Sequence, residues 1–351
     1  MTSQRVFITG ATGFVGRHLI AHLNARGAAA DIFGSCFPER PESCADLCRA
    51  ERNVRLVHLD LRDAGAVDMA IASIRPSRIY HLAALSQVRL SWEKRSETFD
   101  TNLRGTFNLY EAARRHAPRA RILFVSTSDV YGFLKPRRRP CRERDRGVIV
   151  SPYAFTKVSG ELLSEFYSLQ EKLPIVTARP FPHTGPGQTA DFVCSDWARQ
   201  IALIEKYKAH DDSGGPGGRL GEGRREPRSG KKRGPGAVPV IRVGNLALRR
   251  DYSDVRDVVR AYALLMGKGK PGEVYNVCCG RAASLEWILK TLLSYSRRKI
   301  AYEIDPARIR KVDIPYLAGD NAKLRQATGW APRIPLDQTL SDILAFWRAR
   351  V

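Results

Sequence analysis

The stretch Val6–Leu19, VFITGATGFVGRHL, decides the fold of this chain. It begins with the apolar and β-branched residues of a buried strand and continues with the apolar spacing of a helix. Gly10, Gly13 and Gly16 separate the two elements, and glycine lets a backbone turn tightly and approach a diphosphate closely. The N–H groups and positive dipole at the start of the helix favour the same anionic ligand. The spacing is GxxGxxG, a variant of GxGxxG, and we expect a dinucleotide to bind at this turn.

Beyond this turn, the first half of the chain alternates short apolar runs with longer amphipathic stretches. The apolar runs are ADIFG, VRLVHLD, RIYHLAA and RILFVSTS. This alternation predicts strands joined by helices, and right-handed crossovers then produce a doubly wound parallel sheet with helices on both faces. Ligands of such α/β sheets bind at the carboxyl ends of the strands, where the polar residues of these runs fall.

At 351 residues, the chain is long enough for a second, smaller α/β unit towards the C-terminus. We expect a dinucleotide-binding domain over residues 1–178 and about 240–265, and a substrate domain over residues 179–207 and 266–351. Residues 208–238 form a Gly/Arg-rich insertion with the composition of a flexible segment. Because lengthening a loop costs little free energy, one interpretation of the insertion is a harmless loop. The alternative is that the insertion acts as a gate or as an interaction segment.

Composition limits the classes of function. Lys and Arg number 58 against 36 Asp and Glu, which gives a formal charge of +22. The basic runs Lys135–Arg146 and Ser213–Gly236 lack interleaved aromatic residues, so nucleic acid is not an expected partner. Seven cysteines at irregular spacing without a CxxC pair predict reduced thiols and no bound metal. No apolar run approaches the roughly 18 residues that span a membrane, and no signal peptide is evident, so we expect a cytoplasmic protein without a membrane partner.

A candidate catalytic pair lies on the helix expected from about Pro152 to Leu169, for which Ser151 is a good N-cap. Tyr153 and Lys157 are four residues apart and therefore share one helix face. An ammonium beside a phenol favours the phenolate, so we expect a lowered pKa that makes Tyr153 a proton donor or acceptor near neutral pH. YxxxK also occurs by chance as a surface pair, but the glycine turn and the STS upstream favour catalysis.

The motifs GATGFVG, HLAA, TNLRGT, VSTSDVYG and SPYAFTK, in this order and spacing, resemble those of the extended short-chain dehydrogenase/reductases. The resemblance covers nearly the whole chain apart from the insertion, and it implies a Rossmann-type domain. It further implies that Thr127 hydrogen-bonds the reacting sugar oxygen, that Tyr153 is the catalytic acid/base, and that Lys157 holds the nicotinamide ribose. A homodimer formed through two helices of each subunit is implied by the family alone.

The same resemblance implies the cofactor contacts. Asp60 would meet the adenine ring, and Asn102 would fix the active-site helix, although a capping or packing amide also explains Asn102. The second strand ends without an acidic residue for a ribose 2′-hydroxyl, whereas Ser35 and Arg40 suit a 2′-phosphate, so NADP(H) is favoured over NAD(H). The expected cofactor contacts are Gly10, Thr12, Gly13, Phe14, Val15, Gly16, Asp60, Leu61, Leu82, Ala83, Ala84, Asn102, Tyr153, Lys157 and Pro180.

In its second half the chain carries ARPFPHTGPGQ, RRDYSDVRDVVRAY, DPARIR and AGDNAKLRQATGW. These motifs resemble the GDP-4-dehydro-6-deoxy-mannose reductases and, less closely, the GDP-mannose 4,6-dehydratases. The resemblance implies a GDP-sugar substrate whose diphosphate is clamped by Arg250 and Arg310, and guanidinium groups do match phosphate oxygens. The other expected substrate contacts are Ser86, Gln87, Thr127 and His183.

Three activities stay open. In a reductase, hydride reaches the C4 ketone of a GDP-4-dehydro-6-deoxy-hexose and Tyr153 supplies a proton. A 4,6-dehydratase also needs a base near the sugar, and Asp129 in STSD stands where dehydratases carry Glu. The C-terminal motifs favour the reductase. A catalytically lapsed dinucleotide-binding sensor or scaffold is the third alternative, because Pro182 replaces an Asn of the family pattern; Lys311, where the reductases commonly have Pro, is a milder departure.

Overall fold

The computed structural model describes residues 4–25, 30–37, 47, 51, 53–133, 139–211, 238–309 and 314–351. The chain forms two compact units. Unit 1 comprises Met1–Thr184, Arg249–Ala283 and Ile314–Leu336, and unit 2 comprises Gly185–Leu248, Ser284–Asp313 and Asp337–Val351. Residues 212–237 of the predicted insertion and residues 134–138 of the first basic run lie outside the described residues.

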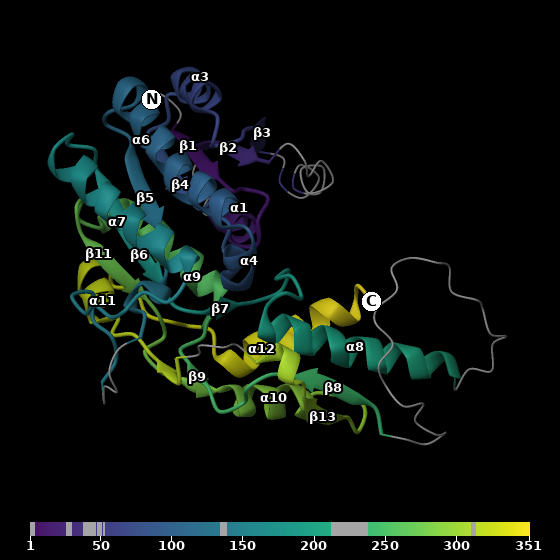
Figure 1. Ribbon diagram of the computed structural model, residues 1–351. Helices are drawn as coiled ribbons and strands as arrows, with labels where there is room; N and C mark the ends of the chain where they lie inside the picture. The colour runs from purple at the N-terminus through teal and green to yellow at the C-terminus, as the bar shows by residue number, and fades with distance from the viewer. Residues whose placement is uncertain are drawn as a thin grey trace. The chain divides into compact units, whose positions relative to one another are not determined.

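A seven-stranded sheet forms the centre of unit 1 (Figure 1). Its order is β11-β6-β5-β4-β1-β2-β3, and every neighbouring pair is parallel. The chain moves outward from β1 to β3 and then, from β4, in the other direction, so the carboxyl ends of β1 and β4 flank a switch point. The predicted doubly wound α/β sheet is confirmed. The strands are β1 Gln4–Thr9, β2 Ala30–Cys36, β3 Val54–His58, β4 Arg78–His81, β5 Arg121–Val125, β6 Ile175–Pro180 and β11 Val274–Val277.

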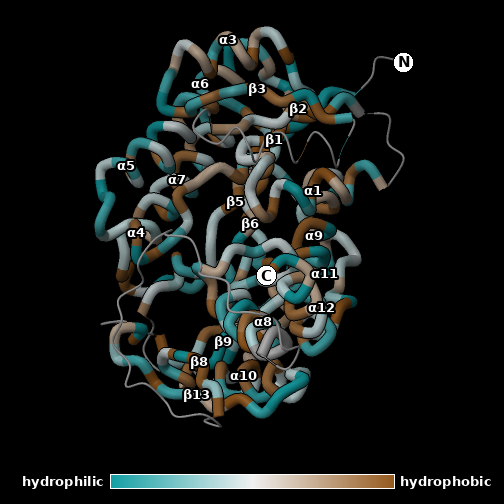
Figure 2. Tube along the Cα trace, turned by 90° about the vertical axis from the view of Figure 1, so that its right-hand side faces the viewer, coloured by the Kyte–Doolittle hydropathy of each residue, from teal (hydrophilic) through white to brown (hydrophobic). Residues whose placement is uncertain are grey.

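Helices cover both faces of this sheet. Side chains of β1 alternate between them: Val6 and Ile8 join the core under α1 and α9, whereas Phe7 joins the core under α3, α6 and α7 (Figure 1). Figure 2 shows hydrophobic stretches along the strands between these layers. The helices of unit 1 are α1 Phe14–Ala25, α3 Ala64–Ile74, α4 Val88–Glu93, α5 Arg95–Phe99, the π-helical turn η1 Asp100–Arg104, α6 Gly105–His116, the 3-10 turn η2 Ser128–Tyr131, α7 Pro152–Leu169, α9 Val255–Lys268 and α11 Ala322–Thr328.

Short strands extend unit 1 beyond the main sheet. Strand β7, His183–Thr184, pairs with β10, Ser253–Asp254, and β9, Arg249–Arg250, pairs with β14, Tyr316–Leu317. Both pairs are parallel. The segments that follow β6 therefore return to unit 1 after each excursion of the chain into unit 2.

Unit 2 is the smaller α/β unit. Its parallel pair, β8 and β13, lies beside helices α8 and α10, and Arg348 of α12 forms an ion pair with Glu205 of α8 at 2.7 Å. The elements are α8 Val193–Asp211, β8 Val240–Val243, α10 Leu285–Ser294, β13 Ala301–Ile304, the 3-10 turn η3 Pro306–Arg308 and α12 Leu336–Arg348, while β12 Ala283–Ser284 lies at the boundary of the two units.

The division differs at several places from the domains expected from sequence. Residues 179–184, 266–283 and 314–336, expected in the substrate domain, lie in unit 1, whereas residues 240–248, expected in the dinucleotide-binding domain, lie in unit 2. The pairing of β11 with β6 places residues 274–277 in the main sheet. Which ligand each unit binds stays a prediction. Within the described ranges, no helix combines the length and apolarity needed to cross a bilayer.

Candidate active site

The glycine turn lies between β1 and α1, at the carboxyl edge of the sheet. Gly10 has a positive φ of 70°, and a Cβ there would lie 3.0 Å from the backbone of Ala83, which follows β4. A Cβ on Gly16 would lie 2.4 Å from the carbonyl oxygen of Gly10. These contacts leave no room for a side chain at either position. The turn is therefore a closely packed cradle of backbone at the start of a helix, which suits a diphosphate.

Ser35 of β2 hydrogen-bonds the glycine turn. Its hydroxyl accepts the N–H of Gly10 at 3.2 Å, and its side chain is buried. The hydroxyl keeps its own proton to donate, so the expected contact of Ser35 with a 2′-phosphate stays a prediction. Arg40, the other residue expected there, lies outside the described residues.

A buried relay joins the ends of β1 and β4. Thr9 accepts the N–H groups of Leu82 and Ala83, each at 3.1 Å, and its hydroxyl lies 2.8 Å from Nδ1 of His81. Since a hydroxyl has one proton, Thr9 donates that proton to Nδ1. Nε2 of His81 then donates to Thr106, which in turn donates to the carbonyl of Asn102. Burial, aided by the charge of Lys157, lowers the pKa of His81 to about 3, so the ring stays neutral.

Asn102 lies in the π-helical turn and connects two segments of the site. Its amide accepts the N–H of Leu85 at 2.8 Å, and its NH₂ group donates to the carbonyl of Leu85 and to the hydroxyl of Thr156. Thr156 stands on α7 between Tyr153 and Lys157. The amide thus ties the loop after β4 to α7, an arrangement consistent with the expected helix-fixing role.

Asp60 and Leu61 follow β3. The carboxylate of Asp60 forms a bidentate pair with Arg62, with a shortest distance of 2.6 Å, and these hydrogen bonds lower its pKa. Leu61 is buried in the core on the α3 and α6 side of the sheet. Arg62 also lies over the ring of Phe37, 5.6 Å from its centroid. Both carboxylate oxygens of Asp60 already accept hydrogen bonds from Arg62, which leaves fewer lone pairs to accept a hydrogen bond from an adenine ring. The expected contact between Asp60 and adenine stays a prediction.

The predicted catalytic residues come together where the end of β5 meets α7. The ammonium of Lys157 donates to the carbonyl of Val125 at 2.7 Å, and Thr127 hydrogen-bonds the hydroxyl of Tyr153. All three side chains are buried. Burial lowers the pKa of Lys157 to about 8, against the opposing influence of Glu161. The structure therefore places a hydroxyl, a phenol and an ammonium around one strand end.

The pKa of Tyr153 moves in the direction opposite to that expected. Burial raises it first, the charge of Asp129 raises it further, and only the hydrogen bond from Thr127 lowers it. The expectation of a lowered value was wrong, because desolvation penalises the phenolate and Lys157 donates to a backbone carbonyl. The phenol accordingly stays protonated near neutral pH.

Asp129 belongs to the 3-10 turn that follows Thr127. Its backbone N–H donates to the Thr127 hydroxyl at 3.2 Å, which makes Thr127 the N-cap of this turn. The charge of its carboxylate acts on Tyr153. A carboxylate is thus present beside the phenol, as the dehydratase alternative requires.

The segment after β6 contributes His183. Its ring stacks at 8° on Phe14 of the glycine-turn helix, with centroids 6.3 Å apart, and Nδ1 donates to the carbonyl of Phe181. Pro180 is buried at the end of β6. Pro182 accepts the N–H of Ser253 at 2.9 Å, so its backbone is used although its side chain has no donor. His183 therefore lies against the expected cofactor turn.

The remaining substrate contacts are not brought into this cluster by any hydrogen bond described. Ser86 is exposed, and Gln87 precedes α4 as an N-cap without a side-chain bond. Arg250 donates to the carbonyl of Arg249 at 3.0 Å and is only partly buried. Arg310 lies outside the described residues, as does Lys311.

Comparison with known proteins now gives the family. Residues 6–278 match the model of the NAD dependent epimerase/dehydratase family. The chain belongs to this family. Residues 231–343 also match the model named GDP-mannose 4,6 dehydratase. The match to the epimerase/dehydratase family spans the sheet, the glycine turn and the cluster around Tyr153.

Individual members of the family are similar over the full chain. GDP-6-deoxy-D-mannose reductase of Pseudomonas aeruginosa is 31% identical over 99% of both chains, and GDP-mannose 4,6 dehydratase of Cricetulus griseus is 24% identical over 84% of this chain and 76% of its own. Among solved structures, RMD from Pseudomonas aeruginosa in complex with NADPH superposes with a TM-score of 0.77 at 28% identity, covering 99% of this chain and all of that one. UDP-glucose 4-epimerase of Thermus thermophilus with NAD, at 24% identity and a TM-score of 0.79 over 99% of this chain and all of its own, shows the shared fold.

Sequence reasoning missed several residues of this family member's site. Thr9 and His81 were not singled out, although His81 opens the HLAA motif. Asp251 was also missed: its buried carboxylate accepts N–H groups from Cys279, Gly280 and Gly319 at 2.9 to 3.1 Å and so joins two loops of unit 1. The signal in the sequence that could have identified these three residues is that each is a polar residue inside one of the motifs quoted above.

Proposed function

We propose that this chain reduces the C4 ketone of a GDP-4-dehydro-6-deoxy-hexose with NADPH. The observation that carries the proposal is the buried cluster of Thr127, Tyr153 and Lys157, in which the phenol stays protonated. Reduction of a ketone needs a proton donor at the developing alkoxide, and a protonated phenol is one. The full-length similarity to a GDP-6-deoxy-D-mannose reductase supports the same reaction and the GDP-sugar substrate.

The cofactor proposed for this site fits the residues present, because the glycine turn leads directly into the start of α1, where backbone N–H groups and the helix dipole favour a diphosphate. When bound, the reduced nicotinamide supplies hydride. We propose that the backbone of Gly10, Gly13 and Gly16 and the start of α1 bind its diphosphate. The second strand ends in Cys36 without an acidic side chain, which supports NADP(H) over NAD(H).

In the proposed mechanism, the hydroxyl of Tyr153 hydrogen-bonds the C4 oxygen and transfers its proton as negative charge develops there. Thr127 donates a second hydrogen bond to the same oxygen, exchanging its present partner for the substrate. Lys157, charged below its pKa of about 8, stabilises the phenolate left behind. Burial of all three groups strengthens each of these interactions, since little water screens them.

A GDP-mannose 4,6-dehydratase is the second candidate function. It is supported by the carboxylate of Asp129, whose charge reaches Tyr153, and by the match of residues 231–343 to the dehydratase model. In that reaction Asp129 would remove the C5 proton. The third alternative, a binder without catalysis, would leave the protonated Tyr153 unused.

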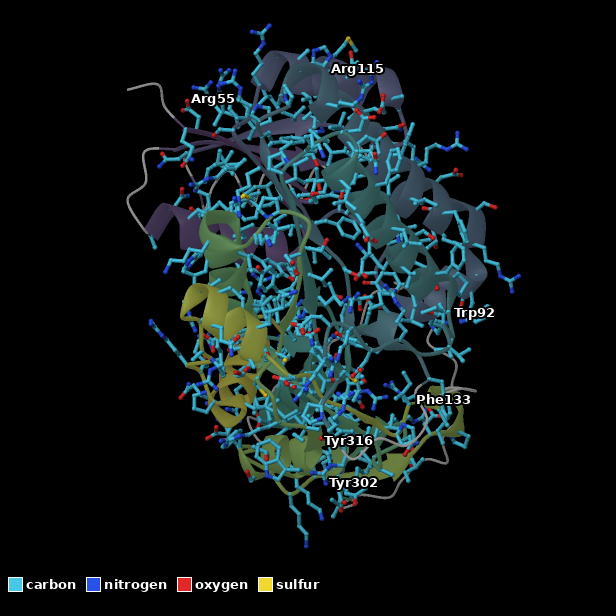
Figure 3. All side chains as sticks on the ribbon, turned by 90° about the vertical axis from the view of Figure 1, so that its left-hand side faces the viewer. Arg55, Trp92, Arg115, Phe133, Tyr302 and Tyr316 are labelled. Atoms are coloured by element: carbon cyan, nitrogen blue, oxygen red, sulfur yellow. The ribbon has the colours of Figure 1, made fainter. Side chains whose placement is uncertain are left out.

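A homodimer is part of the proposal. Phe155, Leu162 and Leu169 recur every seven residues along α7 and form one exposed apolar stripe. Phe99 of α5 extends the stripe, with its ring 5.5 Å from that of Phe155, and Trp92 of α4 is half exposed at the edge of the view in Figure 3. We propose that the same stripe of a second copy of the chain packs against it in the homodimer.

A cytoplasmic location is also part of the proposal. It is supported by the proposed cofactor and substrate, NADPH and a GDP-sugar.

The deciding experiment offers the purified protein two pairs of cofactor and substrate. The first is NADPH with GDP-4-dehydro-6-deoxy-mannose, and the second is NADP⁺ with GDP-mannose. NADPH with GDP-4-dehydro-6-deoxy-mannose should consume NADPH, and Tyr153→Phe should abolish this consumption while NADPH still binds. Tyr110→Phe is the matched control, because Tyr110 is equally buried but donates to or accepts from Ser164 elsewhere on α7. GDP-mannose converted to a keto sugar without net NADPH turnover would instead establish the dehydratase. Inactivity with both pairs would contradict both enzymes.

A further inference from the structure

The face of α7 that carries the catalytic pair continues for one more turn. Tyr153, Lys157 and Glu161 are spaced four residues apart, so all three project from the same side of the helix. All are buried, with exposed fractions of 8%, 5% and 9%. A carboxylate this deeply buried is costly unless its charge is compensated. Glu161 therefore needs a buried partner that compensates its charge.

Three consecutive residues at the end of β5 meet these three side chains. The carbonyl of Val125 accepts from Lys157 at 2.7 Å, and the hydroxyl of Ser126 donates to Glu161 at 2.5 Å. The next residue, Thr127, hydrogen-bonds Tyr153. The carboxylate thus holds the middle of the three residues, and the two neighbours of that residue contact the proposed catalytic side chains directly.

Arg179 of β6 holds the carboxylate itself. Its guanidinium forms a bidentate pair with Glu161, at 2.7 and 2.6 Å, and is itself buried. It donates further to the carbonyl of Glu143 and to the hydroxyl of Tyr131. A guanidinium fixed by four acceptors leaves the carboxylate little freedom to move. The position of Ser126 is thereby set from β6 as well as from α7.

We propose that Glu161 is a positioning residue of the active site: fixed by Arg179, its carboxylate holds Ser126 and so keeps Val125 and Thr127 in register with Lys157 and Tyr153. The consequence for catalysis rests on the proposed function, whereas the geometric part stands independently. Glu161 also acts electrostatically, since its charge opposes the burial that lowers the pKa of Lys157. Lys157 also acts on His81 of β4, which stays neutral near pH 7, and Tyr153 on the same helix face is neutral too and feels the charge of Asp129.

A purely structural tie between α7 and β6 would predict something different. It would make the Glu161–Arg179 pair important for stability and Ser126 unimportant for turnover. Ser126→Ala separates the two possibilities, because it removes the hydroxyl and leaves the buried ion pair intact. Ser164→Ala is the matched control: Ser164 is also a buried hydroxyl, but it contacts Tyr110 and the carbonyl of Gly160 and does not touch β5.

The first measurement is hydrogen exchange by mass spectrometry on the full-length protein, which needs neither substrate nor cofactor. We expect Ser126→Ala to speed exchange of residues 126–131 about tenfold, because their hydrogen-bonded positions are no longer held, while Ser164→Ala changes it less than about twofold. Equal exchange in the two variants would overturn the inference. This comparison remains decisive even where the wild-type protein turns over no GDP-sugar, an outcome that would contradict the proposed function alone.

Kinetics supply the second measurement. Ser126→Ala should lower kcat about tenfold with KM changed less than about twofold, since a hydrogen bond to a charged group commonly contributes such a factor. In Glu161→Gln, the alkaline limb of the pH profile should move to lower pH, because the group that keeps Lys157 charged is gone. If Glu161→Gln does not fold, Ser126→Ala still distinguishes the positioning role from a purely structural one. A kcat no lower than that of Ser164→Ala would refute the positioning role.

Discussion

The hydroxyl of Thr9 lies 2.8 Å from Nδ1 of His81, and both side chains are buried where β1 and β4 end. Because the hydroxyl already accepts two backbone N–H groups, its single proton goes to the imidazole. The ring must therefore be neutral for this bond to form. Thr9 also holds the backbone of Leu82 and Ala83, and Ala83 lies against Gly10 of the glycine turn. The protonation state of His81 is therefore linked to the structure of the expected cofactor site.

Acidification should destabilise the protein through His81. Its folded-state pKa of about 3 lies below its ordinary value of 6.5, so the stability it contributes is complete above pH 6.5 and is lost as the pH falls towards 3. Each pH unit below 6.5 costs about 1.4 kcal/mol, or about 2 kcal/mol at pH 5. Urea unfolding at pH 7 and pH 5 should show this loss in the wild type and not in His81→Gln. His58→Gln, which removes an exposed imidazole, should retain the wild-type slope.

Activity should fall on the alkaline side at a pH set by Lys157. Burial lowers its pKa to about 8, so the ammonium is present below this pH and is lost as the pH rises through it. The pH profile of kcat/KM should therefore bend downward near pH 8. Lys157→Met should lower kcat/KM by about a hundredfold or more and abolish the bend. A bend that persists in Lys157→Met would assign the limb to another group.

A methyl group at Gly16 should damage the glycine turn. The added Cβ would lie 2.4 Å from the carbonyl of Gly10 and 2.6 Å from that of Ala11, so the turn has to move. We expect Gly16→Ala to cost about 1 to 3 kcal/mol of stability and to weaken NADPH binding, measured by urea unfolding and fluorescence titration. Gly267→Ala is the control: it is exposed in α9 with nothing near its Cβ, and should stabilise by about 0.5 to 1 kcal/mol.

Cys279 should resist alkylation in the native protein. Its thiol donates to the buried carboxylate of Asp251 at 2.9 Å, and burial, together with that charge, raises its pKa to about 12. The reactive thiolate is therefore scarce at pH 8. Peptide mapping after iodoacetamide treatment should find Cys279 unmodified in the native state and modified after unfolding in urea. Native labelling as fast as that of a small free thiol would contradict the described environment.

Local patterns in the sequence were sufficient for the architecture. The apolar runs and the glycines of Val6–Leu19 predicted the first strand, turn and helix, and the alternation that follows predicted the doubly wound sheet. The parallel sense of the sheet follows from such patterns, because parallel strands need helical crossovers and those crossovers have a fixed hand. Tyr153 and Lys157 were likewise predictable as neighbours, since residues four apart on a helix share a face.

Quantities that depend on distant segments were not predictable. The direction of the Tyr153 pKa follows from how completely the phenol is covered and from Asp129, and no local spacing reports either. The hydrogen bond from Gly10 to the hydroxyl of Ser35 was not predicted either, because the two residues are 25 positions apart. The membership of β11 in the main sheet was equally hidden, because nearly a hundred residues separate it from β6 in sequence.

The sequence by itself determined the main strands and helices of the first half, the doubly wound class of the sheet and the residue types at the site. Only the tertiary structure decided which of those residues touch: Glu161 with Ser126 and Arg179, 35 and 18 positions away along the chain. The physical reason is that hydrophobic periodicity is a local property of the chain, whereas burial, charge pairing and proton affinity are set by whichever remote segments exclude water from a side chain.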